Sequence, residues 1–275
     1  MLTLFSPAKI NLFLRILGKR PDGYHELSSL FQTISLGDTL HFQLHESDEL
    51  TCQDPTIPTD QTNLIWKAIN LFRRHTGTHF KIKVHLDKCI PIQAGLGGGS
   101  SNAATALWAC NQLTGGQIPA NTLSQWGAEI GSDISFFFSQ GTAYCTGRGE
   151  IVRSLPALPN TYLWIVKPPI GLSTPEIYKR FQLDPHQNKE NKQSDLDQFL
   201  CEKSLYVNDL EKPAFEVQPE LKILKDNLLQ SGFDRVLMTG SGSAFFCLGE
   251  GRPPVDTFAF RSQFINRNPA LWYSE

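Results

Sequence analysis

Alternation of apolar and polar residues predicts strands at several places along the chain. In residues 8–16 the apolar side chains occupy every second position, while Lys9 and Asn11 fall side by side on the more polar face. This is the pattern of a half-buried strand. Similar patterns predict further strands at residues 80–86, 136–138, 142–144, 162–166, 235–239 and 244–248.

Helical spacing of apolar residues alternates with these strands. We expect helices at residues 63–72, 101–113, 121–130 and 219–230. Thr62 or Asn63 is placed to cap the first of them. Turns are expected at residues 21–23 and 240–243. The pattern is that of an α+β protein in two halves, and Pro156 and Pro159 favour a boundary that divides the chain into domains 1–155 and 156–275.

One polar stretch interrupts the pattern, and the bulk composition excludes several classes of protein. Residues 184–197 are nearly free of apolar side chains and predict a mobile loop or a connection between domains. The net charge of −2 gives no sign of a nucleic-acid binder. No segment approaches the roughly 20 apolar residues of a membrane span, and the first residues do not resemble a signal peptide. We therefore expect a cytoplasmic protein without membrane or nucleic-acid partners.

The six cysteines lie far apart in the sequence. They form no CxxC pair and no metal-ligand spacing with histidine. We expect reduced cysteines that act as small apolar residues.

A glycine-rich segment is the strongest chemical signal. Glycine occupies four of the five positions 95–99, and Ser100, Ser101 and Asn102 then open a predicted helix. Glycines before a helix N-terminus allow several backbone N–H groups to converge on phosphate oxygens. The alternative is a flexible loop or a tight turn between a strand and a helix. The segment matches neither the Walker A pattern nor GxGxxG. Lys88, just before it, would reach a nucleotide or would be a solvated lysine at a strand end.

Three motifs together resemble a known superfamily. They are SPAKINLFL at residues 6–14, GLGGGSSNAA at residues 95–104 and GSGSAFF at residues 240–246. In this order they are similar to the galactokinase, homoserine kinase, mevalonate kinase and phosphomevalonate kinase (GHMP) superfamily. RPDGYHEL at residues 20–27 and GSDI at residues 131–134 narrow the resemblance to the family of 4-diphosphocytidyl-2-C-methyl-D-erythritol kinases. Ser135 stands where that family commonly has proline.

The resemblance implies a fold and a reaction. It implies a two-lobed α+β fold, in which an N-terminal lobe with a mixed sheet and the glycine-rich loop faces a ferredoxin-like C-terminal lobe across the active-site cleft. The implied reaction moves the γ-phosphoryl group of ATP to the 2-hydroxyl of a cytidyl diphosphate substrate in non-mevalonate isoprenoid synthesis. Asp133 would act as the base and Lys9 would orient it and neutralise charge.

The resemblance also implies roles for other residues. Tyr24 and His25 would bind the cytosine base, Tyr178 would cover its other face, Thr174 would touch the diphosphate or ribose, and Asn11 would bind substrate hydroxyls. Magnesium would accompany ATP, and Ser101 would be one of its ligands. The implied ATP-binding residues are Asn63, Lys88, Pro91, Ala94, Gly95, Leu96, Gly97, Gly98, Gly99, Ser100, Ser101, Gly240 and Ser241.

Two other functions fit the same scaffold. One is another small-molecule kinase of the superfamily, of the homoserine or mevalonate type; the other is an inactive nucleotide or sugar sensor. Tyr24, His25 and Tyr178 argue against the first, because an aliphatic substrate needs no platform for a base. Lys9 and Asp133 together argue against the second. The sequence leaves the oligomeric state open.

Overall fold

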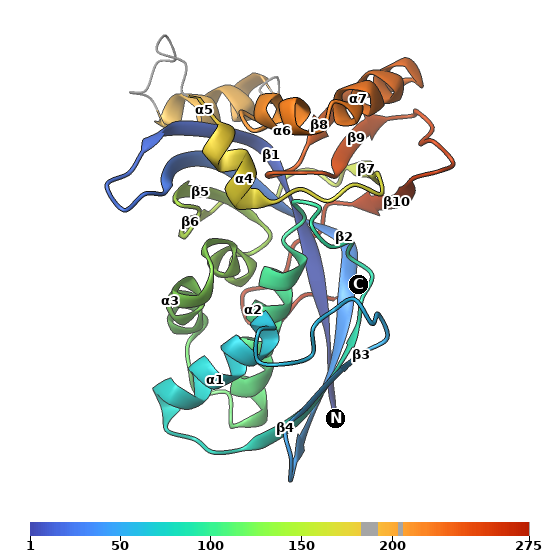
Figure 1. Cartoon of the computed structure of the whole chain (residues 1–275). Helices are drawn as coiled ribbons and strands as arrows, with labels where there is room; N and C mark the ends of the chain where they lie inside the picture. Colours follow the sequence, from blue (N-terminus) through green and yellow to red (C-terminus); the bar gives the residue numbers. More distant parts are fainter. Residues whose placement is uncertain (183–191, 203–205, 275) are drawn as a thin grey trace.

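The computed structural model describes residues 1–182, 192–202 and 206–274. In this part of the chain the secondary structure forms two sheets with helices around them (Figure 1). The first sheet has the order β3-β4-β2-β5-β6, with β1 paired to β2, and contains both antiparallel pairs and the parallel pair β3–β4. Its strands are β1 (Leu2–Lys19), β2 (His25–His45), β3 (Glu49–Cys52), β4 (Lys81–Asp87), β5 (Thr142–Gly147) and β6 (Ile151–Ser154).

Strands β1 and β2 form a long antiparallel hairpin that runs through both halves of the molecule (Figure 1). The turn that joins them contains Pro21, Asp22 and Gly23, as predicted. The expectation that residues 8–16 are half-buried is wrong, because both faces of β1 are covered there. Phe13, on the face predicted to be polar, is fully buried and packs against Phe199.

Three helices and a 3-10 helix complete the first half. They are α1 (Leu64–Thr76), α2 (Gly98–Leu113), α3 (Ala120–Ile130) and η1 (Ser132–Phe138). Asn63 caps α1 as expected, since its side chain accepts from the backbone N–H of Ile65. The strand predicted at residues 136–138 is wrong: these residues belong to η1, and Phe136 and Phe137 are fully buried. A short, continuous apolar run has no periodicity that separates a strand from a helical turn.

The second half is built on an antiparallel sheet of the order β10-β7-β9-β8. Helices precede the hairpin β8–β9, as in a ferredoxin-like unit, while residues 250–257 contain no second helix. The two separate sheets with their helices confirm the predicted α+β class and the two lobes. The elements are β7 (Tyr162–Lys167), α4 (Thr174–Arg180), α5 (Lys192–Glu202), α6 (Glu211–Val217), α7 (Glu220–Gln230), β8 (Phe233–Met238), β9 (Phe245–Gly249) and β10 (Phe258–Gln263).

The C-terminal residues return to the first half. Buried Trp272 packs on Trp108 and on Phe138. The division at residues 155 and 156 stays a prediction. Of the polar stretch 184–197, residues 184–191 lie outside the described residues, and the remainder belongs to α5. All six cysteines are free thiols, as expected.

Candidate active site

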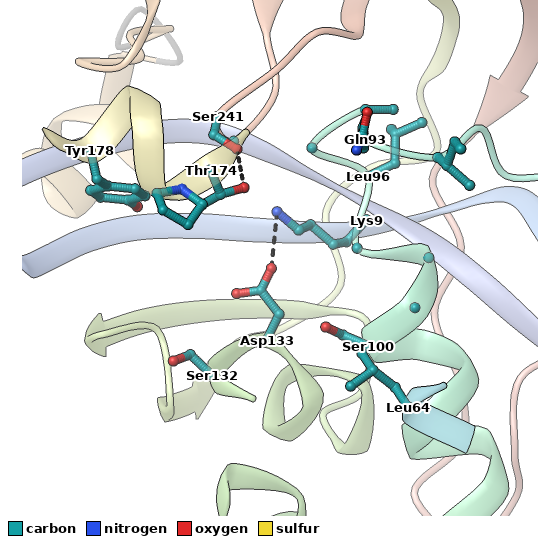
Figure 2. A pocket seen from close by; sticks show the side chains of 18 of the residues that line it. Lys9, Leu64, Gln93, Leu96, Ser100, Ser132, Asp133, Thr174, Tyr178 and Ser241 are labelled. Atoms are coloured by element: carbon teal, nitrogen blue, oxygen red, sulfur yellow. Dashed lines mark hydrogen bonds and ion pairs between the residues drawn. The ribbon is translucent and has the colours of Figure 1, made fainter. Parts of the chain in front are cut away.

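A lysine and an aspartate from distant parts of the chain face each other between the two lobes (Figure 2). Lys9 lies on β1 and Asp133 lies in the first turn of η1. Their Nζ and Oδ2 atoms are 3.4 Å apart. The lysine side chain is 4% exposed, whereas that of the aspartate is 32% exposed. The buried cation is therefore fixed, and the carboxylate is open to a ligand.

Neighbouring polar groups hold the Lys9 ammonium in place. Lys9 Nζ donates to Asn11 Oδ1 at 2.8 Å, as the strand periodicity suggested for two residues on one face. Asn11 Nδ2 donates to Ser29 Oγ at 2.9 Å, and Thr239 Oγ1 donates to Asn11 Oδ1 at 3.2 Å. The ammonium also lies 4.7 Å from the centroid of the Phe31 ring. Asn11 thus lines the site mainly as the residue that positions Lys9.

Two glycines allow the glycine-rich loop, residues 94–99, to lie against the rest of the site. Gly95 has a φ of +73°, and an added Cβ would lie 2.0 Å from the carbonyl oxygen of Thr239. Gly97 has a φ of +69°, and its Cβ would lie 2.9 Å from Cγ of Lys9. Any other residue is strained in this backbone region and has no space here. Helix α2 starts directly after Gly97, so its free N–H groups open next to Lys9.

One cavity of about 1110 Å³ contains the Lys9–Asp133 pair and extends between the lobes. Drug-sized ligands commonly occupy about 300–1000 Å³, so there is room for more than one such ligand. Among the residues implied by the resemblance, those that line this cavity are Lys9, Asn11, Tyr24, His25, Asn63, Lys88, Pro91, Ala94, Gly95, Leu96, Gly97, Gly98, Gly99, Ser100, Asp133, Thr174, Tyr178, Gly240 and Ser241.

Ser101 is the one implied site residue that does not line the cavity. Its side chain is fully buried, and its Oγ accepts from Ser6 Oγ at 2.8 Å. The expectation that Ser101 contacts phosphate or metal therefore disagrees with the structure. The helical rotation explains the difference, because at 100° per residue Ser100 faces the cavity while Ser101 faces β1.

Lys88 lines the cavity, but its ammonium is bound elsewhere. Lys88 Nζ lies 2.9 Å from Oδ2 of the fully buried Asp38 and also donates to the carbonyl of Ile90. It is neither a solvated lysine nor a free cation for phosphate. Asn63 also lines the cavity, but its side chain is bound within the protein. Its Oδ1 caps α1 by accepting from Ile65 N, and its Nδ2 donates to Pro58 O at 2.7 Å.

Aromatic rings lie at the end of the cavity away from the glycine-rich loop. His25 lies at the start of β2, and its ring centroid is 5.3 Å from that of Tyr178 on α4. Phe181 approaches the same histidine edge-on at 6.1 Å. Tyr24 is 55% exposed and lies beside them on the cavity wall. Thr174 and Ser241 hydrogen-bond each other at 2.7 Å and join α4 to the turn between β8 and β9 (Figure 2).

The pKa of His25 is lowered, chiefly by burial and further by the charge of Lys19. The ring is therefore neutral at pH 7 and takes up a proton only below its ordinary pKa of 6.5. A neutral imidazole offers one donor and one acceptor, which suits the edge of a base.

We expect the KM for a cytidyl substrate to rise as the pH falls below 6.5, because protonated His25 loses its acceptor. His25→Gln keeps a neutral donor and acceptor and should lose this acid limb. The measurement is KM between pH 5 and 8. The same acid limb in both proteins would exclude His25 as its source.

The sequence gives no signal for several residues that line the cavity. Lys19, Arg148 and Lys179 line the cavity with no motif to mark them. They lie at a strand end, in a turn and in a short helix, respectively, where a single basic residue usually means a solvated surface. Five apolar residues of the cavity wall were also missed, because apolar side chains usually belong to the core; they are Ile57, Pro58, Leu64, Leu86 and Ile92.

Ser135, which replaces the family's common proline, has a partner of its own. Its buried hydroxyl donates to Ser124 O at 2.9 Å and ties η1 to α3. Proline would lack this bond. The serine therefore supports the helix that carries Asp133.

Comparison with known proteins gives the family. The GHMP kinases N terminal domain matches residues 63–141, and the GHMP kinases C terminal domain matches residues 190–262. The chain is 60% identical over 272 residues to the 4-diphosphocytidyl-2-C-methyl-D-erythritol kinase of Protochlamydia amoebophila, with 98% of this chain and 92% of the relative covered. It is 48% identical to the chloroplastic enzyme of that name from Arabidopsis thaliana, over all of this chain and 76% of the relative.

Solved structures agree. A crystal structure of 4-(cytidine 5'-diphospho)-2C-methyl-D-erythritol kinase matches with a TM-score of 0.77 and 32% identity, covering 96% of this chain and 99% of that one. A homoserine kinase from Cytophaga hutchinsonii matches with a TM-score of 0.74 at 17% identity, covering 97% and 95%, which shows the shared fold.

The chain belongs to the GHMP kinases and is a small-molecule kinase, a class for which ATP is the cosubstrate. Within them it belongs to the family of 4-diphosphocytidyl-2-C-methyl-D-erythritol kinases. Along the described residues, every helix is too short or too polar to cross a bilayer. The cytoplasmic location stays a prediction.

Proposed function

We propose that this protein transfers the γ-phosphoryl group of ATP to the 2-hydroxyl of 4-diphosphocytidyl-2-C-methyl-D-erythritol. The observation that carries the proposal is the combination of 60% identity to an enzyme of that name with a Lys9–Asp133 pair in the shared cavity. The pair lies between the glycine-rich loop and the aromatic end of the cavity. An acceptor hydroxyl placed there faces both the γ-phosphate of ATP and the carboxylate of Asp133.

The oxygen of the substrate's 2-hydroxyl bonds to the γ-phosphorus while Asp133 accepts the hydroxyl proton. The bond between the γ-phosphorus and the bridging oxygen breaks, and ADP leaves with that oxygen. Positioning and charge neutralisation dominate such transfers. Lys9, held by Asn11, lies 3.4 Å from the carboxylate and brings positive charge to the transferring group. Free N–H groups at the start of α2 bind phosphate oxygens.

Magnesium fits this site as part of Mg-ATP. Among the described residues, no cluster of three or more His, Cys, Asp or Glu side chains forms a metal cage. Mg²⁺ commonly keeps several waters and binds through one or two carboxylates plus the phosphates. Ser100, which lines the cavity in the first turn of α2, would offer the ion a hydroxyl oxygen beside the phosphates (Figure 2). When bound, the ion neutralises phosphate charge.

The base end suits a cytidyl diphosphate. Tyr24 offers a platform, neutral His25 offers hydrogen bonds, and the Tyr178 ring lies 5.3 Å from that of His25. The cations Lys19 and Lys179 attract the diphosphate. Turnover of 4-diphosphocytidyl-2-C-methyl-D-erythritol with release of ADP, set against mevalonate and homoserine as acceptors, tests the proposal. Equal or higher activity with either of the other acceptors would overturn it.

We expect Tyr24→Ala to raise the KM for the cytidyl substrate about 5- to 150-fold, since stacking of a base on an aromatic ring contributes about 1–3 kcal/mol. The KM for ATP should barely move, because Tyr24 lies at the opposite end of the cavity. Steady-state kinetics with each substrate varied in turn measures both constants. Equal changes in the two would mean that the base binds elsewhere.

A further inference from the structure

A tight turn connects the base end of the cavity to the catalytic carboxylate. It joins β5 to β6 and contains Gly147, Arg148 and Gly149. Both glycines have positive φ, at +71° and +112°. A Cβ added at Gly149 would lie 3.5 Å from Asp133 Oδ1, so the backbone of the turn passes directly beside the base of the reaction.

The side chain between these glycines reaches Tyr24. The Arg148 guanidinium carbon lies 4.8 Å from the centroid of the Tyr24 ring, and both residues line the cavity. The guanidinium is oriented from its own turn, because Glu150 accepts the backbone N–H of Arg148 at 2.5 Å and lies 3.7 Å from its Nε. Arg148 is thus held independently of any ligand.

Among the residues that the structure describes, none forms a hydrogen bond with the Tyr24 side chain. Its backbone N–H donates to Asp22 Oδ1 at 3.1 Å, but the residue is 55% exposed. An exposed ring on a hairpin turn samples several rotamers. A guanidinium that lies over the ring restricts that freedom and occupies one of its two faces.

We infer that Arg148 is a specificity-determining residue that holds the Tyr24 ring and leaves one face of it for the base of the substrate. The inference rests on the proposed function for its substrate, a cytosine nucleotide. Arg148 acts through Tyr24 and is a positioning residue. Its effect is therefore expected on nucleoside binding and on the KM for the cytidyl substrate, with little change in kcat or in the KM for ATP.

The test compares Arg148→Met with Arg148→Lys, each in the wild-type and in the Tyr24→Leu background. Binding of cytidine and of cytidine 5'-diphosphate is measured by calorimetry, and thermal unfolding controls for folding. We expect Arg148→Met to weaken cytidine binding about three- to tenfold when Tyr24 is present and to have no effect when it is absent. Arg148→Lys keeps the charge but loses the planar guanidinium, and its cytidine affinity should fall between those of wild type and Arg148→Met.

Two results would overturn the inference. One is an unchanged cytidine affinity in Arg148→Met. The other is a loss seen only with the diphosphate and equal in both Tyr24 backgrounds, which would make Arg148 a direct phosphate contact. If the wild-type protein does not bind cytidine at millimolar concentration, Tyr24 is no platform for the base and the inference is also wrong. A protein that binds cytidine as expected but releases no ADP with the cytidyl substrate would contradict the proposed function alone.

Discussion

Asp133→Asn is expected to lower kcat by a factor of about 10²–10⁴, the usual contribution of a positioned general base. The amide has the shape of the carboxylate but accepts no proton. Its charge is also gone, so Lys9, 3.4 Å away and 4% exposed, loses its anionic neighbour. Single-turnover measurement of ADP formation reports the loss in the chemical step.

Binding and folding should survive this change. Asp133 is 32% exposed, and the ATP loop is held by other residues, so the affinity for ATP and the melting temperature should stay near those of wild type. Glu129→Gln is the matched control. It makes the same change four residues earlier, where the carboxylate pairs with Arg74 and His75 on the outside of the molecule. Near-normal turnover of Asp133→Asn would disprove its role as base.

Residues whose role depends on the local pattern were predictable. Strand alternation placed Lys9 beside Asn11, and a hydrogen bond joins them at 2.8 Å. The density of glycine predicted a close backbone approach, and Gly95 and Gly97 have no space for a Cβ. These signals are strong because they follow from backbone geometry.

Residues whose partners are distant in the sequence were less predictable. Ser101 and Ser100 are neighbours of the same type, and only the packing of α2 on Ser6 decides which one faces the cavity. The position of Lys88 before the glycine-rich loop suggests a nucleotide contact. In the structure its ammonium instead binds Asp38, which lies fifty residues earlier in the sequence. Arg148 carries no motif at all, and its place beside Tyr24 depends on how β5 pairs with β2.

Asp38→Ala is expected to destabilise the fold by about 3–5 kcal/mol, the usual cost of removing one partner of a buried ion pair. The carboxylate is fully buried and accepts hydrogen bonds from four donors. It binds Lys88 Nζ at 2.9 Å, the N–H groups of Cys89 and Ile90 at 2.8 and 2.7 Å, and Asn102 Nδ2 at 2.9 Å. These donors belong to the entrance of the glycine-rich loop and to the N-terminal part of α2.

The double variant Asp38→Ala/Lys88→Met separates the charge from the hydrogen bonds. It removes the unpaired ammonium that the single variant leaves in a buried place, so it should be more stable than Asp38→Ala alone. Urea unfolding of the single and double variants measures the coupling. The KM for ATP should rise in both, because Cys89, Ile90 and Asn102 lose the acceptor that aligns the loop with α2. A loss below about 1 kcal/mol, or double and single variants of equal stability, would mean that Asp38 does not organise the glycine-rich loop.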